Sequence, residues 1–172
     1  PASADVELSY TYYLDMVGEP DSALAHVRRA VSLDPTNPFM ILNLARRFAF
    51  AGMIDSAVAA YERTLVMDSA QDWAHAHLAQ LFVATGRPAE AEREITRFLR
   101  SNGDPESLAN AASFYASAAR PDLARDMLRR LEGLARSSDV PVSFIAMAKL
   151  AAGDRPGALD GLEKAAYMTF RS

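Results

Sequence analysis

The stretch GEPDSALA at residues 18–25 is repeated as GMIDSAVA at residues 52–59 and, more loosely, as GRPAEAER at residues 86–93. The glycines that open these three stretches are 34 residues apart. A period between about 20 and 50 residues is typical of stacked supersecondary units that each contact their neighbours. The spacing therefore predicts an array of repeats.

Two further units follow in the same register. Gly153 lies 67 residues beyond the third glycine, close to two more periods. Between these two glycines, AARPDLAR at residues 118–125 carries Ala119 in the glycine's place. A small residue stands five positions after each turn residue, at Ala23, Ala57, Ala91, Ala124 and Ala158. We therefore expect five units.

Each unit has the pattern of two helices joined by the glycine. Before Gly52, Ile41 and Leu44 follow helical spacing, and Ala57 and Tyr61 continue it after the turn. Glycine accepts the left-handed backbone conformation that ends a helix, and proline favours the first turn of the next one. Four of the five turns have such a proline, namely Pro20, Pro88, Pro121 and Pro156. With alternating β-branched runs absent from the sequence, we predict an all-α fold.

Composition excludes several classes of function. The chain has 172 residues, a net charge of -4 and no cysteine. An acidic chain without a basic arm is unlike a nucleic-acid binder, and a chain without cysteine has no disulfide and no thiolate metal site. No apolar run reaches the roughly 20 residues that a membrane helix needs. We expect no nucleic-acid partner and no membrane insertion.

The pattern of polar residues does not predict an enzyme. His75 and His77 point to different sides of a helix, and no carboxylate completes a metal-ligand spacing. Phosphate-binding glycine loops and nucleophile motifs are absent from the sequence. We therefore expect no catalytic residue, no metal and no cofactor. Because the chain starts at Pro1, we interpret it as an excised domain or a processed product, and we expect a cytoplasmic protein or the extracytoplasmic part of a membrane-anchored one.

These residues resemble the tetratricopeptide repeat (TPR) family. In the third unit the family's packing positions are held by Leu78, Ala79, Phe82, Gly86, Ala91 and Phe98. The resemblance covers nearly the whole chain and implies a single domain, a right-handed α-solenoid of five helix-turn-helix repeats at about 4–37, 38–71, 72–104, 105–138 and 139–172. The last repeat is also similar to terminal repeats of bacterial signalling proteins. The family implies a protein-protein interaction module without chemistry of its own.

By this resemblance, the first helices of the units line a concave surface that binds a peptide or a partner helix. The candidate binding residues are Tyr12, Phe39, Asn43, Arg46, Phe50, Trp73, His77, Gln80 and Asn110. Asn43 and Asn110 hold the place where the family often bonds a peptide backbone, unless they only cap a helix or meet solvent. Trp73 either anchors a ligand or packs between units, and Arg46 either pairs with a carboxylate or lies at a solvated edge.

The family's carboxylate clamp is not expected. Of its residues only Asn43 is present, because Leu8 and Tyr12 stand in the first unit where the clamp needs Lys and Asn, and Trp73 and His77 replace basic residues in the third. The surface is instead apolar and aromatic. We therefore expect a hydrophobic segment to bind by insertion of its side chains.

Self-assembly is the alternative function. The last unit ends on AAYMTFRS, whose Tyr167, Met168 and Phe170 have no following helix to pack against. Because each end of a repeat array exposes a face suited to another unit, either the natural chain continues beyond this end or these three residues form a homodimer interface. In the first unit, Tyr10 is expected to lie in the core.

Overall fold

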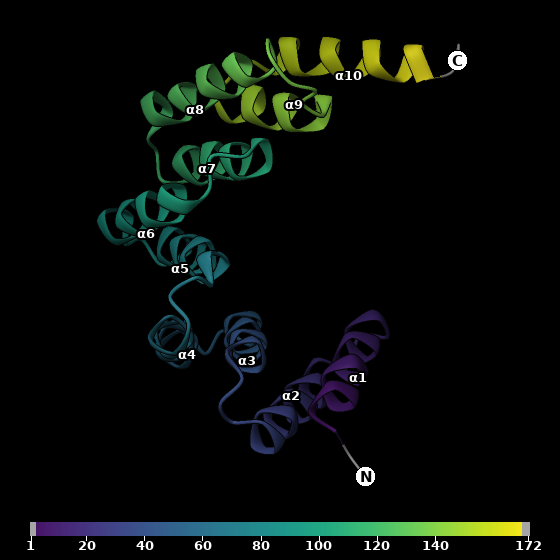
Figure 1. The fold of residues 1–172 in the computed structure, drawn as a ribbon, viewed down its shortest axis with the longest axis vertical. Coiled ribbons are helices and arrows are strands. Elements are labelled where there is room, and N and C mark those ends of the chain that lie inside the picture. The colour runs from purple at the N-terminus through teal and green to yellow at the C-terminus, as the bar shows by residue number, and fades with distance from the viewer. Residues whose placement is uncertain (1–2, 170–172) are drawn as a thin grey trace. The chain divides into compact units, whose positions relative to one another are not determined.

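The computed structural model describes residues 3–169, and these form helices joined by short turns, as Figure 1 shows. The helices are α1 (Ala4–Met16), α2 (Pro20–Leu33), α3 (Pro38–Phe50), α4 (Ile54–Met67), α5 (Asp72–Ala84), α6 (Pro88–Ser101), α7 (Pro105–Ser117), α8 (Pro121–Leu134), α9 (Val142–Ala151) and α10 (Arg155–Thr169). The all-α prediction is confirmed. Each of the five expected repeats holds two consecutive helices, while the repeat bounds themselves stay a prediction.

The chain divides into two compact units, one up to Leu81 and one from Phe82, so the boundary falls inside α5. In the first unit α1 packs on α2, α2 on α3, and α3 on α4. In the second unit α7 packs on α8, α9 on α10, and α9 also contacts both α7 and α8. Consecutive helices thus pack as pairs, and each pair packs on the next within its unit.

The turns inside the pairs have the left-handed conformation that the sequence predicts. Gly18, Gly52, Gly86 and Gly153 have φ angles of 79°, 70°, 72° and 90°, and Ala119 has φ 56°. In the four turns that have glycine, this conformation is adopted without strain. In the fifth turn, the Cβ of alanine crowds the backbone. Ala119 therefore marks a strained turn between α7 and α8.

Replacing Ala119 with glycine is expected to stabilise the fold. Relief of the left-handed strain exceeds the extra chain entropy that glycine loses on folding, for a net gain of roughly 0.5–1 kcal/mol. The matched control is Ala118→Gly, because Ala118 has φ -82° and needs no glycine. Urea unfolding should give a higher midpoint for Ala119→Gly and a lower one for Ala118→Gly. Equal midpoints for the two variants would show that the turn is not strained.

The small residues of the repeat pattern lie where the paired helices approach each other. Ala23, Ala57, Ala91, Ala124 and Ala158 are all fully buried. A larger side chain at these places would separate the helices, because a packed core does not absorb added volume without strain. The alanines thus explain why the repeats keep a small residue in this register.

The contact between α2 and α3 shows how one pair packs on the next. Met40 and Leu44 of α3 lie against a core that contains Leu8 of α1 and Val27 of α2, with Leu24 of α2 at its edge. The apolar side chains of α3 therefore pack against an apolar face of α2. The positions that Met40 and Leu44 hold in the second repeat are held in the first repeat by Val6 and Tyr10.

Candidate functional site

Exposed aromatic side chains lie on α1, α3 and α5, the first helices of the first three repeats. Tyr12 of α1, Phe39 and Phe50 of α3, and Trp73 of α5 are between 41% and 75% exposed. Burying such rings yields a large part of the energy of many protein interfaces. We call these four residues the aromatic surface.

A chain of contacts connects the predicted residues across the three helices. The Tyr12 hydroxyl donates to Asn43 Oδ1 at 3.0 Å, and Arg46 Nη1 lies 3.5 Å from the same oxygen. The guanidinium of Arg46 in turn acts electrostatically on His77, whose ring centroid lies 6.5 Å from that of Trp73. The structure therefore brings together Tyr12, Asn43, Arg46, His77 and Trp73.

Asn43 already has partners within the fold. Its side chain is buried at 4% exposure, its oxygen accepts from Tyr12, and its Nδ2 donates to the carbonyl oxygen of Phe39 at 2.9 Å. A bound peptide would have to displace Tyr12 to reach the amide oxygen. The direct peptide contact of Asn43 stays a prediction, and in this structure the residue positions Tyr12.

His77 is held in its neutral form. Burial first, and the nearby Arg46 guanidinium second, lower its pKa to about 4. Its ring stacks on Tyr61, with centroids 5.7 Å apart, and burial raises the pKa of that phenol to about 12 against the opposing effect of Arg46 and Arg47. At neutral pH the site therefore holds an uncharged imidazole above an uncharged phenol.

The two adjacent arginines have different surroundings. Arg47 pairs with Asp15 and its guanidinium lies 5.0 Å from the centroid of the Phe50 ring. Arg46 is half-buried, and within residues 3–169 no carboxylate lies at ion-pair distance from it. Of the two guanidinium groups, only that of Arg47 is paired with a carboxylate within residues 3–169.

The remaining predicted residues lie apart from this cluster or outside the description. Gln80 is exposed on α5, and Asn110 is half-buried on α7 in the second unit. Tyr167 is exposed on α10. The Met168 side chain and Phe170 lie outside the described residues, so their part in an interface stays a prediction.

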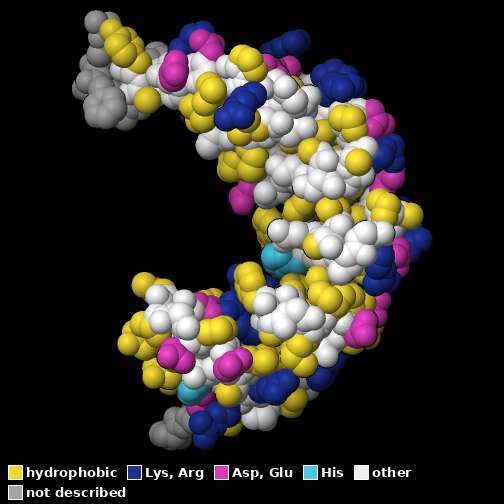
Figure 2. All heavy atoms as spheres, turned by 180° about the vertical axis from the view of Figure 1, so that it is seen from behind, with side chains coloured by type: hydrophobic (Ala, Val, Ile, Leu, Met, Phe, Trp, Pro, Cys, Tyr) yellow, Lys and Arg dark blue, Asp and Glu magenta, His cyan; other side chains and the backbone are white. Residues whose placement is uncertain are grey.

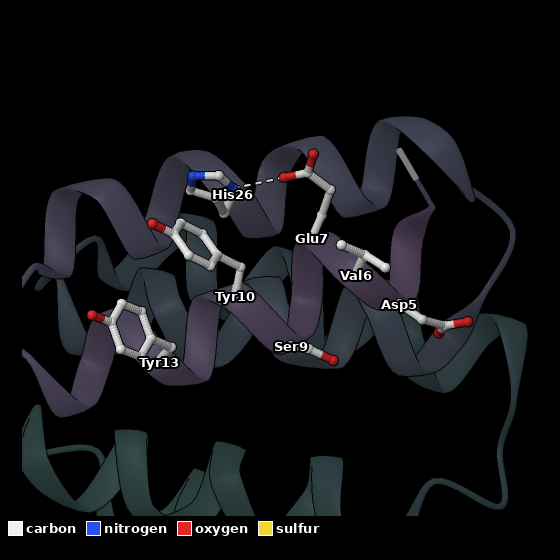
Figure 3. A pocket seen from close by; sticks show the side chains of 7 residues that line it. All are labelled: Asp5, Val6, Glu7, Ser9, Tyr10, Tyr13 and His26. Atoms are coloured by element: carbon white, nitrogen blue, oxygen red, sulfur yellow. Dashed lines mark hydrogen bonds and ion pairs between the residues drawn. The ribbon is translucent and has the colours of Figure 1, made fainter. Parts of the chain in front are cut away.

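A cavity of about 490 Å³ opens between α1 and α2, at a place that the sequence did not indicate (Figure 3). The ring of Tyr10 stacks on that of Tyr13 with centroids 5.6 Å apart and meets His26 edge-on at 4.7 Å. The core position expected for Tyr10 is wrong, since 46% of this residue is exposed. Its helical spacing was correct, but no described helix packs over this face of α1. The cavity is lined by Asp5, Val6, Glu7, Ser9, Tyr10, Tyr13 and His26.

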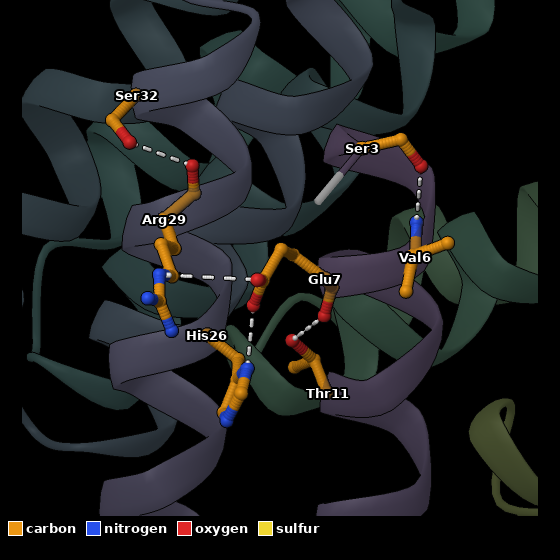
Figure 4. A network of polar contacts seen from close by, with 7 residues as sticks. All are labelled: Ser3, Val6, Glu7, Thr11, His26, Arg29 and Ser32. Atoms are coloured by element: carbon orange, nitrogen blue, oxygen red, sulfur yellow. Dashed lines mark hydrogen bonds and ion pairs between the residues drawn. The ribbon is translucent and has the colours of Figure 1, made fainter. Parts of the chain in front are cut away.

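A polar network closes one side of the cavity (Figure 4). Glu7 is 8% exposed, its Oε2 lies 2.6 Å from Nδ1 of His26, and its Oε1 lies 3.8 Å from Nε of Arg29. Because a buried carboxylate is costly unless it is paired, these two partners explain why Glu7 is tolerated there. The sequence signal that could have indicated this network is Glu7, a charged residue at a position with the helical spacing of the core.

Charge distribution, metal-ligand groupings and membrane-spanning character give no further sign of a site in the described part of the chain. Basic and acidic side chains are interspersed over the face drawn in Figure 2. Across the described part of the chain, no group of three or more His, Asp or Glu side chains is placed to hold a metal ion. Among the helices described, none combines the length and the apolar character needed to cross a membrane.

Comparisons with known proteins identify the type of fold. No protein-family model matches the chain. Over 162 residues, or 88% of its length, the chain is 29% identical to the cellulose synthase operon protein C of Xanthomonas axonopodis pv. citri (strain 306). It spans only 11% of the length of that relative.

Solved TPR structures match almost the whole chain. A thermophilic TPR protein of Thermus thermophilus is 21% identical with a TM-score of 0.71, covering 94% of this chain and 89% of that one. A putative kinesin light chain of Podosopora anserina with TPR-like repeats is 16% identical with a TM-score of 0.73, covering 97% and 95%. MamA from Desulfovibrio magneticus RS-1 is 11% identical with a TM-score of 0.63, covering 98% and 96%. By its fold, the chain is a TPR-like repeat protein.

Proposed function

We propose that this chain binds a segment of another protein on the aromatic surface of its first unit, and that it has no catalytic activity of its own. TPR folds generally serve protein-protein interaction, and here four aromatic side chains on three successive first helices are exposed. Exposed aromatic clusters of this kind mark interaction sites more often than scattered apolar residues do. The exposure of aromatic rings on α1, α3 and α5 is the observation that carries the proposal.

We further propose the chemistry of the bound segment. Arg46 lies beside the aromatic surface, is half-buried, and has no carboxylate partner among residues 3–169. A ligand carboxylate would satisfy this guanidinium in a place where water screens it less than at an open surface. The segment is therefore expected to carry an acidic group next to apolar side chains, and neutral His77 adds no second charge.

The wider role is proposed from the relative. The name of the matched protein places it in a cellulose synthase operon, and this chain corresponds to 11% of its length. We propose that the chain is an interaction module of a larger bacterial protein, with partners in a polysaccharide-synthesis assembly. A signalling role rests only on the resemblance of the last repeat to repeats of bacterial signalling proteins. The cellular compartment of this module would be that of the larger protein that contains it.

Peptide selection followed by titration tests the proposed surface. Peptides selected from a display library on the wild-type chain are titrated while the fluorescence of Trp73, the single tryptophan, is recorded. Phe50→Ala and Arg46→Gln are each expected to raise the dissociation constant at least about tenfold, the loss of a typical anchor contact. The matched control is Val66→Ala, an apolar side chain on α4 that is at least as exposed as Phe50.

Two results would contradict the proposal. Selected peptides that bind Phe50→Ala and Arg46→Gln as tightly as the wild type would place the binding site elsewhere. Peptides that bind without changing Trp73 emission would do the same. Replacing the acidic residue of a selected peptide is expected to weaken its binding to the wild type but not to the Arg46→Gln variant.

A further inference from the structure

Asn43 is a buried polar residue whose side-chain hydrogen bonds go to residues of the candidate site. Its Oδ1 accepts from the Tyr12 hydroxyl at 3.0 Å and lies 3.5 Å from Nη1 of Arg46. Its Nδ2 donates to the carbonyl oxygen of Phe39 at 2.9 Å. Because only 4% of the residue is exposed, little of its amide is left for a ligand to touch. Asn43 therefore reaches the site through its neighbours.

The orientation of this amide is fixed from within α3. Its donating end faces the carbonyl oxygen of Phe39, four residues earlier on the same helix. Its accepting end faces two donors, the hydroxyl of Tyr12 and the guanidinium of Arg46. A reversed amide would set its NH2 group against both donors and its oxygen against the carbonyl oxygen. Only one orientation satisfies all three contacts, so Oδ1 of Asn43 is an acceptor in a fixed place.

The hydrogen bond to Tyr12 connects α1 with α3. The two residues are 31 positions apart in the sequence, and the bond restrains the Tyr12 side chain at the end farthest from its backbone. A side chain that is ordered before a ligand arrives loses less conformational entropy when the ligand binds. Restraint of the Tyr12 ring by Asn43 would therefore favour binding.

Arg46 is restrained by the same oxygen but keeps the capacity to bond a carboxylate. A separation of 3.5 Å is long for a hydrogen bond, so this contact orients the guanidinium more than it holds it. A guanidinium has five N–H donors, and the contact with Asn43 involves Nη1. Asn43 thus limits the directions from which a ligand carboxylate meets Arg46.

We propose that Asn43 is a positioning residue, which holds the Tyr12 ring and the Arg46 guanidinium where a bound segment uses them and does not itself bond that segment. The proposal rests on the proposed function of the aromatic surface. It gives Asn43 a different role from the direct peptide contact that the resemblance to the TPR family implies.

A double-mutant cycle tests this role with the display-selected peptides, again followed by Trp73 fluorescence. Tyr12→Phe keeps the ring and removes the hydroxyl, so it is expected to raise the dissociation constant about fivefold, the value of one ordinary hydrogen bond. Asn43→Ala is expected to raise it by at least that factor, since it releases both Tyr12 and Arg46. In the Asn43→Ala background, adding Tyr12→Phe should weaken binding no further, because the hydroxyl has already lost its partner there.

Three results would overturn the proposal. Penalties that multiply in the double variant would mean that Asn43 contacts the peptide directly. Tighter binding by Tyr12→Phe would mean that the peptide displaces Tyr12 to reach the amide. Unchanged dissociation constants for both single variants, with a lower unfolding midpoint for Asn43→Ala, would mean that Asn43 serves only the stability of the fold.

The matched control is Tyr13→Phe, which removes a hydroxyl from a ring of the same helix that stacks on Tyr10, and it should bind like the wild type. Circular dichroism verifies that all variants keep their helix content. If Asn43→Ala does not fold, Tyr12→Phe alone decides, since unchanged or tighter binding by that variant contradicts the proposal.

Failure of the proposed function is recognised separately. In that case Phe50→Ala and Arg46→Gln would bind the peptides as tightly as the wild type. If those two variants weaken binding while the penalties of Tyr12→Phe and Asn43→Ala multiply, the aromatic surface is the binding site and only the positioning role of Asn43 is wrong.

Discussion

Replacing Tyr61 with alanine is expected to lower the free energy of unfolding by about 3–5 kcal/mol, the usual cost of truncating a buried aromatic ring. Tyr61 is 2% exposed on α4, and its ring stacks beneath His77 of the candidate site. The truncation would leave a cavity where α4 supports α5. Guanidinium chloride unfolding, followed by circular dichroism at 222 nm, measures the loss.

Tyr61→Phe is the matched control, because it keeps the ring and removes only the hydroxyl. A loss for Tyr61→Ala no larger than that for Tyr61→Phe would show that the ring does not support the fold. The alanine variant should also open His77 to water, so its pKa should rise from about 4 towards 6.5. Proton NMR of the histidine ring follows that change directly.

Acidification from pH 7 to pH 4 is expected to destabilise the fold by up to about 3 kcal/mol through His77 alone. The unfolded chain binds a proton on this imidazole near pH 6.5, while the folded chain does so only near pH 4. Between these values the unfolded state holds more protons, so stability falls as the pH falls. Above pH 6.5 both states carry the neutral ring and this contribution is constant.

The His77→Gln variant isolates this effect from that of the acidic residues. Denaturant unfolding of wild type and variant at pH 7, 6, 5 and 4 gives the difference between their stabilities at each pH. That difference should change in favour of the variant as the pH falls. A constant difference would mean that His77 titrates normally in the folded chain.

The repeat pattern was sufficient to predict the fold because each repeat forms the same pair of helices joined by the same kind of turn. The glycine positions predicted the left-handed turns. The repeat register also placed Ala119 in such a turn, although alanine disfavours the left-handed conformation that glycine adopts easily. Small residues in register predicted where helices approach each other. These features depend on contacts within a pair or between neighbouring pairs, which a periodic sequence records.

The details of the site could be predicted only in part. The sequence placed Arg46 and Arg47 side by side, but only the structure shows that Asp15 pairs with the second and leaves the first without a carboxylate among residues 3–169. Tyr10 was expected in the core because its spacing is that of a packing residue, yet burial depends on what lies beyond the helix. Periodicity gives the side of a helix on which a residue lies, and the neighbour that covers it has to be observed.

The pairing of helices that are close in sequence also bears on how the chain folds. The packed pairs described above join helices that are adjacent or separated by one helix, so no long segment has to find a distant partner. Low contact order of this kind favours rapid folding, and short-range coupling permits partial opening of one unit while another stays folded. The two compact units are therefore expected to exchange their amide hydrogens at separate rates.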